Sequence, residues 1–149
     1  LLMGAAMTQH PEMFRVVVSF VGIYDMLRVE LSPNGAFNVT EFGTVKDEAQ
    51  FRALHAYSPY HHVKDGTDYP PLLMLAADHD DRVDPMHARK FVARVQAADP
   101  MGVHLLRIER NAGHGGADQV SKSIEQQADV YAFLFAALGV TPPKPAPKP

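Results

Sequence analysis

Three short apolar runs are the clearest pattern in the chain. Residues 14–21 (FRVVVSFV) and 71–77 (PLLMLAA) are apolar at consecutive positions and not only at every second one. Such runs are typical of strands that are buried on both faces, as in the interior of a parallel sheet. Residues 103–109 (VHLLRIE) predict a third strand.

Helices are predicted before, between and after these strands. Residues 1–10 are small and apolar, lack a capping residue at their start and end before a proline. Residues 84–98 open with Asp84 and a proline, the favoured pair for an N-cap and a first helical position. Two more helices are expected at residues 47–56, ended by the break at 57–60, and at about 118–138, ended by Gly139.

The order of these elements predicts the fold class. Helix, strand, loop region, strand, helix, strand and helix alternate along the chain, which favours an α/β fold with a parallel sheet and flanking crossover helices. Residues 24–46 show little periodicity, and a turn is expected at 32–35. We expect one domain over residues 1–140. Residues 141–149 are rich in proline and are expected to be a disordered, extended tail.

Composition narrows the class of protein. The 149 residues are 46% hydrophobic and 21% charged, which suits a globular domain, and no run is long enough to span a bilayer. The net charge of −3 and the absence of a basic stripe argue against a nucleic-acid partner. Without cysteine, the chain has no disulfide and no thiol nucleophile. These features leave both the cytoplasm and the periplasm open as compartments.

Polar loops follow two of the predicted strands. Residues 78–82 (DHDDR) follow the second strand, and residues 111–116 (NAGHGG) follow the third. Because parallel strands end at the same edge of a sheet, an aspartate of the first loop is expected to meet His114 of the second. A carboxylate bound to one imidazole nitrogen fixes the tautomer of the ring, and the other nitrogen then serves as a general base.

A nucleophile for this base is missing from the chain. The elbow pattern Gly-x-Ser-x-Gly, which follows a strand and precedes a helix, does not occur. The chain nevertheless begins within a predicted helix, and in α/β-hydrolases the serine precedes the aspartate and the histidine. We therefore expect the chain to be the C-terminal part of a longer protein whose upstream part supplies the serine.

Several stretches together resemble the C-terminal part of the catalytic domain of the prolyl oligopeptidase family of serine peptidases. They are LLMGAAMTQHPEMF, VGIYDML, YSPYHHV, YPPLLMLAADHDDRVDPMH and NAGHGG, in family order over residues 1 to about 139. The resemblance implies an α/β-hydrolase fold, a nucleophile just before Leu1, and no metal or other cofactor. It implies Asp80 as the triad acid and His114 as the base, with an oligopeptide as substrate. Arg82 matches an arginine that binds a substrate carbonyl, and Val83 and Ile23 match apolar pocket residues.

The sequence departs from the family pattern in the substrate pocket. Asn38, beside Phe37, stands where a tryptophan stacks on the substrate proline. Phe42 replaces a pocket tyrosine, and Asn34 replaces an isoleucine. An amide does not supply the flat apolar platform on which a proline ring packs. An esterase or acyl-aminoacyl hydrolase that accepts varied acyl groups therefore stays open.

Two readings from other classes also stay open. Three histidines near aspartates, His61, His62 and His79, suit a metal-dependent hydrolase. Residues 57–63 are better interpreted as a structural connection, and we expect no metal there. A non-catalytic interaction module is the other alternative. In the preferred reading, the chain by itself is expected to be inactive and poorly stable, because it carries only part of a sheet.

Overall fold

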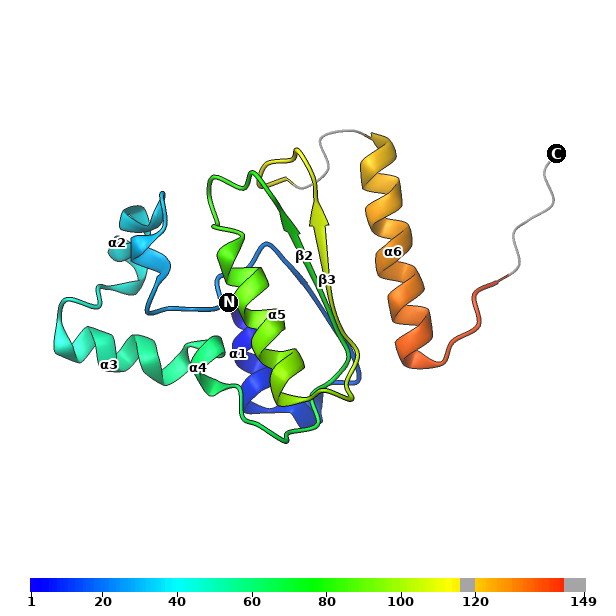
Figure 1. The fold of residues 1–149 in the computed structure, drawn as a ribbon, viewed down its shortest axis with the longest axis horizontal. Helices are drawn as coiled ribbons and strands as arrows, with labels where there is room; N and C mark the ends of the chain where they lie inside the picture. Colours follow the sequence, from blue (N-terminus) through cyan, green and yellow to red (C-terminus); the bar gives the residue numbers. More distant parts are fainter. Residues whose placement is uncertain (116–119, 144–149) are drawn as a thin grey trace.

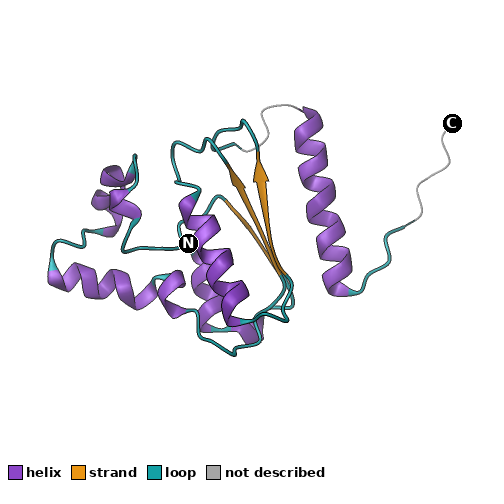
Figure 2. Cartoon of the chain, viewed as in Figure 1, coloured by secondary structure: helices purple, strands orange, loops and turns teal. Residues whose placement is uncertain are grey.

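A computed structural model describes residues 1–115 and 120–143 of the chain (Figures 1 and 2). The strands are β1 (Val17–Phe20), β2 (Leu72–Ala77) and β3 (His104–Glu109). The α-helices are α1 (Leu2–Gln9), α2 (Val39–Phe42), α3 (Glu48–Tyr57), α4 (Pro59–His62), α5 (Met86–Ala98) and α6 (Val120–Leu138). Three 3₁₀ helices are η1 (Pro11–Met13), η2 (Val29–Leu31) and η3 (Gly35–Asn38).

The three strands form one parallel sheet in the order β1-β2-β3. Val17 of β1 pairs with Leu72 of β2, which pairs in turn with His104 of β3. All three strands therefore end at the same edge, and the loops after β2 and β3 lie side by side there (Figure 1). The predicted parallel α/β architecture is confirmed.

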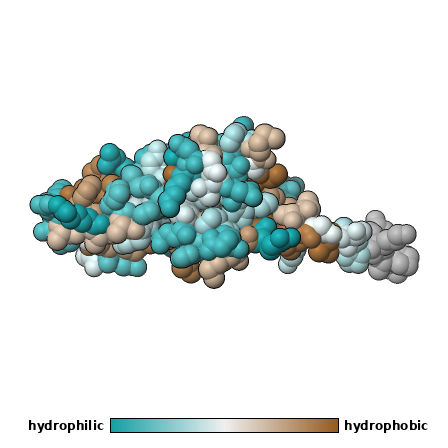
Figure 3. Space-filling view, turned by 90° about the horizontal axis from the view of Figure 1, so that it is seen from below, coloured by the Kyte–Doolittle hydropathy of each residue, from teal (hydrophilic) through white to brown (hydrophobic). Residues whose placement is uncertain are grey.

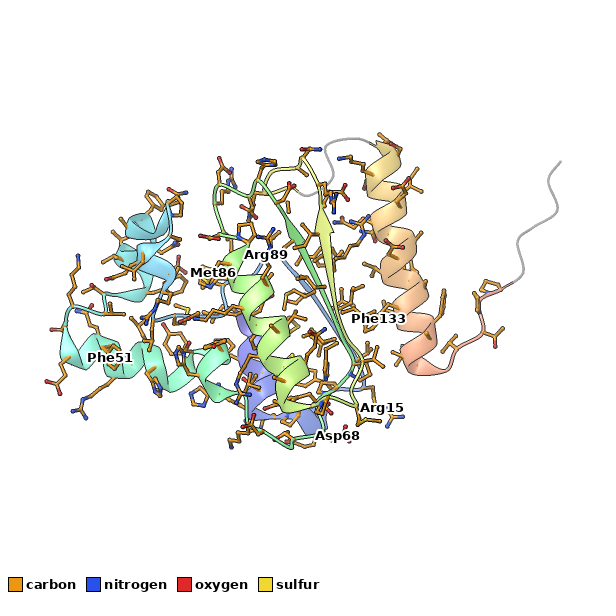
Figure 4. All side chains as sticks on the ribbon, in the orientation of Figure 1. Arg15, Phe51, Asp68, Met86, Arg89 and Phe133 are labelled. Atoms are coloured by element: carbon orange, nitrogen blue, oxygen red, sulfur yellow. The ribbon has the colours of Figure 1, made fainter. Side chains whose placement is uncertain are left out.

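Burial accounts for the unbroken apolar sequence of the central strand β2, because all six of its residues are buried. Successive side chains of a strand point to opposite faces of the sheet. Leu72, Met74 and Ala76 join the core with residues of α1 and α5, whereas Leu73 and Leu75 pack with Val130 of α6. On that second face Phe133 reaches from α6 toward the strands (Figure 4). The sheet is thus covered on both faces.

The structure corrects the extent and burial of the first predicted strand. β1 spans Val17–Phe20 instead of residues 14–21, and its burial alternates along the strand. Val17 is 3% exposed, while Phe20 at the other end is 46% exposed. The reason is that β1 pairs with only one of the described strands, so it is an edge strand of this sheet.

Pro85, and not the predicted Asp84, occupies the N-cap position of α5, but Asp84 still binds the first turn of that helix. The carboxylate of Asp84 accepts the N–H of Met86 at 2.8 Å at the start of α5, and Asp47 caps α3 through the N–H of Gln50 at 2.9 Å. Gly139 follows α6 in the left-handed conformation (φ 64°). The expected break after α3 occurs at Ser58, but the connection is itself helical, because Pro59 opens α4.

A separate small core beside the sheet is formed largely by residues 26–46 together with α3. Met26, Leu27, Val29 and Leu54 are buried together, and the segment folds into η2, η3 and α2. The face in Figure 3 is largely hydrophilic, with hydrophobic residues interspersed, some of them at the end occupied by α2 and α3. Phe37 there is 80% exposed.

Two predicted segments near the end of the chain fall partly outside the described residues. The expected start of the final helix at residue 118 and most of the proline-rich tail, 144–149, lie there. Residues 141–143 are exposed and belong to no helix or strand. None of the helices in the described ranges has the length and hydrophobicity needed to cross a membrane.

Candidate active site

The loops after β2 and β3 are joined by hydrogen bonds between their backbones. The N–H of Asp78 donates to the carbonyl of Glu109 at 3.0 Å, and that of His79 donates to the carbonyl of Ala112 at 3.1 Å. The N–H of Ala112 in turn lies 3.4 Å from the carboxylate of Asp78. These contacts extend the β2–β3 ladder beyond the strands and fix the two loops relative to each other.

Asp80 is held in a fixed orientation within the first loop. Its side chain is 2% exposed. Oδ1 accepts the backbone N–H groups of Arg82 and Val83, both at 2.9 Å. A buried carboxylate needs hydrogen-bond donors to replace water. The tight turn after Asp80 supplies two of them from the backbone.

His114 completes the pair that the sequence predicts. Its Nδ1 lies 3.0 Å from Oδ1 and 2.9 Å from Oδ2 of Asp80. A carboxylate can only accept, so Nδ1 carries the proton and Nε2 is left with a free lone pair. The His114 side chain is 31% exposed. The imidazole therefore combines a buried partner on one nitrogen with access to solvent, as a general base requires.

The turn that presents His114 is made at an asparagine. Asn111 adopts the left-handed conformation (φ 54°), which asparagine tolerates better than most residues. A Cβ on Gly113 would meet nothing within 4 Å. The backbone thus turns at Asn111, and Gly113 leaves open space next to His114. Gly116 lies outside the described residues.

Salt bridges hold the flanks of the His114 loop. Glu109 at the end of β3 accepts a hydrogen bond from Arg107 at 2.7 Å and lies 3.3 Å from Lys122 Nζ at the start of α6. The Arg107 guanidinium is the main cause that lowers the pKa of Glu109. Partial burial favours the neutral form of Asp78, but hydrogen bonds from Ala112 and the ring of His79 outweigh it and lower the pKa of that carboxyl. Sequence reasoning did not single out Glu109 or Lys122.

Arg82 and Val83 follow Asp80 directly and lie at the same edge of the sheet. Arg82 is exposed, and its guanidinium makes no hydrogen bond or salt bridge within residues 1–115 and 120–143. Val83 is half-buried between the Asp80 turn and the start of α5. An exposed guanidinium beside Asp80 has the right chemistry to bind a carbonyl oxygen.

The other three predicted pocket residues belong to the separate small core. Ile23 follows β1 and so lies at the same edge of the sheet, where it packs on the same cluster as Phe42 of α2. Asn38 is half-buried at the end of η3. Among the described contacts, none joins Asn38 or Phe42 to the Asp80–His114 pair. The structure therefore brings together Asp80, Arg82, Val83 and His114, and groups Ile23 with Phe42.

Two of the histidines considered for metal binding lie near a single aspartate each, His61 near Asp25 and His79 near Asp78. In the described part of the chain, no three histidines, aspartates or glutamates are arranged so that they could hold a metal ion. His61 and His62 both lie on α4, not on a strand. His79 binds Asp78, with its Nδ1 2.9 Å from the carboxylate.

Comparisons with known proteins agree on one family. A sequence model described as the prolyl oligopeptidase family matches residues 1–141. A prolyl endopeptidase from Elizabethkingia miricola is 40% identical over 142 residues, and one from Dictyostelium discoideum is 38% identical over 144. Each alignment covers 94% of this chain but only 20% and 19% of the relative. The chain thus spans about a fifth of the length of these relatives.

Solved structures give the same result for the fold. A chain from a structural and mechanistic study of two prolyl endopeptidases superimposes with a TM-score of 0.91 at 57% identity, covering 94% of this chain and 21% of its own length. A post-proline cleaving enzyme from Rickettsia typhi gives a TM-score of 0.88 at 28% identity, covering 94% and 20%. The sheet and its helices therefore have the arrangement found in the α/β-hydrolase domain of these enzymes.

Proposed function

Since the chain belongs to the prolyl oligopeptidase family, we propose that it is the acid- and base-bearing part of a serine peptidase that hydrolyses peptide bonds of oligopeptides. Asp80 is the acid and His114 the base of a Ser-Asp-His triad. The serine comes from an upstream part of the same polypeptide. The observation that carries the proposal is the Asp80–His114 hydrogen bond, with Nδ1 2.9 Å from Oδ2, so that Nε2 is the nitrogen available for proton transfer.

The proposed mechanism follows from this tautomer. Nε2 of His114 takes the proton of the serine hydroxyl as the serine oxygen attacks the substrate carbonyl carbon. The same proton passes to the leaving amine as the C–N bond breaks, which leaves an acyl-enzyme. His114 then takes a proton from a water that attacks the ester carbonyl, and passes this proton to the serine oxygen as the acyl–oxygen bond breaks and the carboxylic acid product is released. Asp80 keeps Nδ1 protonated throughout and stabilises the imidazolium that forms.

Substrate binding is assigned to residues at the same edge. Arg82 binds a backbone carbonyl of the substrate, and Val83 and Ile23 supply apolar walls for the residue before the scissile bond. The exposure of the Arg82 side chain and the position of Ile23 after β1 support this assignment. Asn38 and Phe42 are assigned to the same pocket on the family pattern alone, in which their positions hold a tryptophan and a tyrosine.

A second candidate, an esterase or acyl-aminoacyl hydrolase of the same fold, is favoured by one observation. Asn38 stands where the family pattern has a stacking tryptophan, and the neighbouring Phe37 is 80% exposed. A pocket without the aromatic platform discriminates less between proline and other acyl groups. A panel of peptide and ester substrates on the full-length protein separates the two candidates.

The decisive experiment labels the full-length protein with a fluorophosphonate and maps the modified residue. We expect one modified serine upstream of residue 1. His114→Ala should abolish labelling and lower peptide turnover by several orders of magnitude. His79→Ala is the matched control, because His79 lies in the adjacent loop, is 69% exposed and also pairs with an aspartate. Turnover in His114→Ala equal to the wild type, or no labelled serine in the active protein, would refute the proposal and favour an interaction module.

A further inference from the structure

An ion pair between a buried carboxylate and a half-buried lysine lies outside the site described above. Asp25 follows β1 and has a side chain that is 1% exposed, and Nζ of Lys90 on α5 donates a hydrogen bond to its Oδ2. The other oxygen, Oδ1, accepts the N–H of Leu27 at 3.1 Å. The Lys90 side chain is 34% exposed, so it is mainly the Asp25 charge that is buried, at a cost in solvation free energy that an ion pair does not always offset. A role in fixing geometry is the alternative.

His87 makes a second connection between the same two segments. The residue is 1% exposed, and its Nδ1 accepts the N–H of Asp25 at 3.2 Å. Because Nδ1 accepts, the proton of the neutral ring sits on Nε2, which is buried and has no hydrogen-bond partner among the described residues. Burial lowers the pKa of His87 and so favours this neutral form, although Asp25 and Asp84 oppose the shift. The His87 ring is therefore oriented by its Nδ1 hydrogen bond, although this orientation leaves Nε2 without a partner among the described residues.

The segment that these contacts hold contains a strained residue. Val21, at the end of β1, has φ 38°, a conformation that a β-branched side chain rarely adopts. Strain of this kind persists only where the surroundings fix the chain. Tyr24 contributes by stacking on Phe91 of α5, with ring centroids 4.7 Å apart, and by a 2.6 Å hydrogen bond between its hydroxyl and that of Ser19. Ile23 lies in this segment, between Val21 and Tyr24.

The first turn of α5 links the ion pair to the Asp80 turn. The N–H of His87 donates to the carbonyl of Asp84 at 3.0 Å, and that of Met86 donates to its carboxylate at 2.8 Å. One residue before Asp84, the N–H of Val83 donates to Oδ1 of Asp80 at 2.9 Å. A displacement of α5 relative to residues 21–25 therefore moves the groups that orient Asp80.

We propose that Asp25, Lys90 and His87 are positioning residues that set the Asp80 turn against the segment carrying Ile23 and thereby keep Asp80 aligned with His114. This inference rests on the proposed function, because it takes Asp80 and His114 as the acid and base. None of the three is assigned a contact with substrate.

Other charged and aromatic groups surround the ion pair. His61 of α4 has its Nδ1 3.9 Å from Oδ1 of Asp25, and the ring of Tyr60 lies 4.2 Å from Lys90 Nζ. Arg28 and Lys90 both act electrostatically on His61. A test at several pH values therefore has to include a variant in which His61 is neutral. His61→Gln serves this purpose.

The test uses the full-length protein with the double substitution Asp25→Asn and Lys90→Met. Removing both charges together avoids an unpaired buried charge, so the fold is expected to persist, and the introduced asparagine keeps an oxygen for the N–H of Leu27. Active sites are counted with a fluorophosphonate, and kcat is expressed per titrated site. We expect kcat to fall roughly 10- to 100-fold with little change in KM, the size of effect that misplacement of a catalytic group produces. We also expect the acidic limb of the kcat profile to move to lower pH, because a less well aligned Asp80 stabilises the imidazolium of His114 less.

Arg94→Met provides the matched control on the same helix. Arg94 pairs with Asp65 and donates to the carbonyl of Val63 at 2.9 Å, so its loss removes a cation and a tertiary contact of α5 near the other end of the sheet. It should lower thermal stability without moving the pH profile. His61→Gln should also leave the acidic limb in place. If the ion pair only stabilises the fold, both α5 variants should keep the wild-type kcat per site and the wild-type pH profile.

A double-mutant comparison links the effect to Asp80. In an Asp80→Asn background, the Asp25→Asn and Lys90→Met pair should lower kcat by less than twofold. A full additional loss there would overturn the inference, and so would a wild-type kcat and pH profile of the pair in the otherwise natural protein. A different result would overturn the proposed function itself, namely wild-type turnover in Asp80→Asn or in His114→Ala. If the double variant does not fold, Lys90→Arg, which keeps the charge, is measured instead and should give a smaller shift in the same direction.

Discussion

The ring of His114 contacts both carboxylate oxygens of Asp80, at 2.9 and 3.0 Å, although the two residues are 34 positions apart in the chain. The parallel register of β2 and β3 brings about this contact, because it places the ends of both strands at one edge. The loops are then locked by the hydrogen bond from the His79 N–H to the Ala112 carbonyl. The acid and base of the proposed triad are thus aligned by the sheet itself.

The first prediction concerns the acid. Asp80→Asn in the full-length protein should lower kcat by roughly 10⁴-fold with little loss of stability, the effect known for the same change in other Ser-His-Asp triads. The asparagine oxygen still accepts the N–H groups of Arg82 and Val83, but His114 is no longer held with Nδ1 protonated. Steady-state kinetics on a peptide substrate measures the change.

Asp81→Asn is the control for this prediction, since Asp81 is the exposed neighbour in the same loop. Its kcat should stay within about twofold of the wild type, because surface substitutions away from the site have small effects. If Asp81→Asn is the more damaging change, the acid has been assigned to the wrong aspartate.

A second prediction separates binding from chemistry at Arg82. Arg82→Met should raise KM for peptide substrates about 10-fold and change kcat little, because a contact present equally in the ground state and the transition state supports binding alone. Arg89→Met is the matched control: Arg89 is an exposed arginine on the first turns of α5 (Figure 4). Equal effects of the two substitutions on KM would remove Arg82 from the substrate site.

Residue patterns alone predicted the parts of the fold that depend on local chemistry and on strand direction. The unbroken apolar run over β2 indicated a strand covered on both faces, and Asp84 followed by proline marked the start of α5. Strand direction also predicted that an aspartate of residues 78–82 meets His114, because all strands of a parallel sheet end at one edge, whereas the choice of Asp80 among them came from the family resemblance.

Features that depend on tertiary packing were not predictable in this way. The Asp25–Lys90 pair joins residues 65 positions apart, and no local pattern marks a charge whose partner comes from another layer. The left-handed conformation of Val21 contradicts the intrinsic preference of a β-branched residue.

A third prediction addresses the pocket. Asn38→Trp should restore an aromatic platform and raise the ratio of kcat/KM for a substrate with proline before the scissile bond to that for alanine, by roughly 3- to 10-fold, the range expected for one added aromatic contact. Phe37→Trp places the same indole one position earlier, on a side chain that is 80% exposed, and should leave the ratio unchanged. A ratio that rises equally in both variants would show that hydrophobicity near α2, not stacking at position 38, sets the preference.

The last prediction concerns the pH dependence of stability at the opposite end of the sheet. Asp99 is 11% exposed, and its carboxylate contacts His104 Nε2 at 3.0 Å and the N–H groups of Tyr69 and Gly102, each at 3.1 Å. Burial alone would raise its pKa, but these hydrogen bonds outweigh burial and lower the pKa below the ordinary value of 3.8. The unfolded chain therefore takes up the proton first on acidification. The stabilising contribution is fully present above about 3.8 and is lost as the pH falls through the lower value of the folded state.

Asp99→Asn should thus destabilise the protein by roughly 1–3 kcal/mol at neutral pH, the cost of losing hydrogen bonds to a charged group in a buried position. The same variant should lose less stability than the wild type between neutral and strongly acidic pH, as measured by urea unfolding at a series of pH values. Asp68→Asn, an exposed aspartate next to Tyr69, should follow the wild-type curve. Parallel curves for Asp99→Asn and the wild type would mean that the Asp99 carboxylate is not a source of the acid sensitivity.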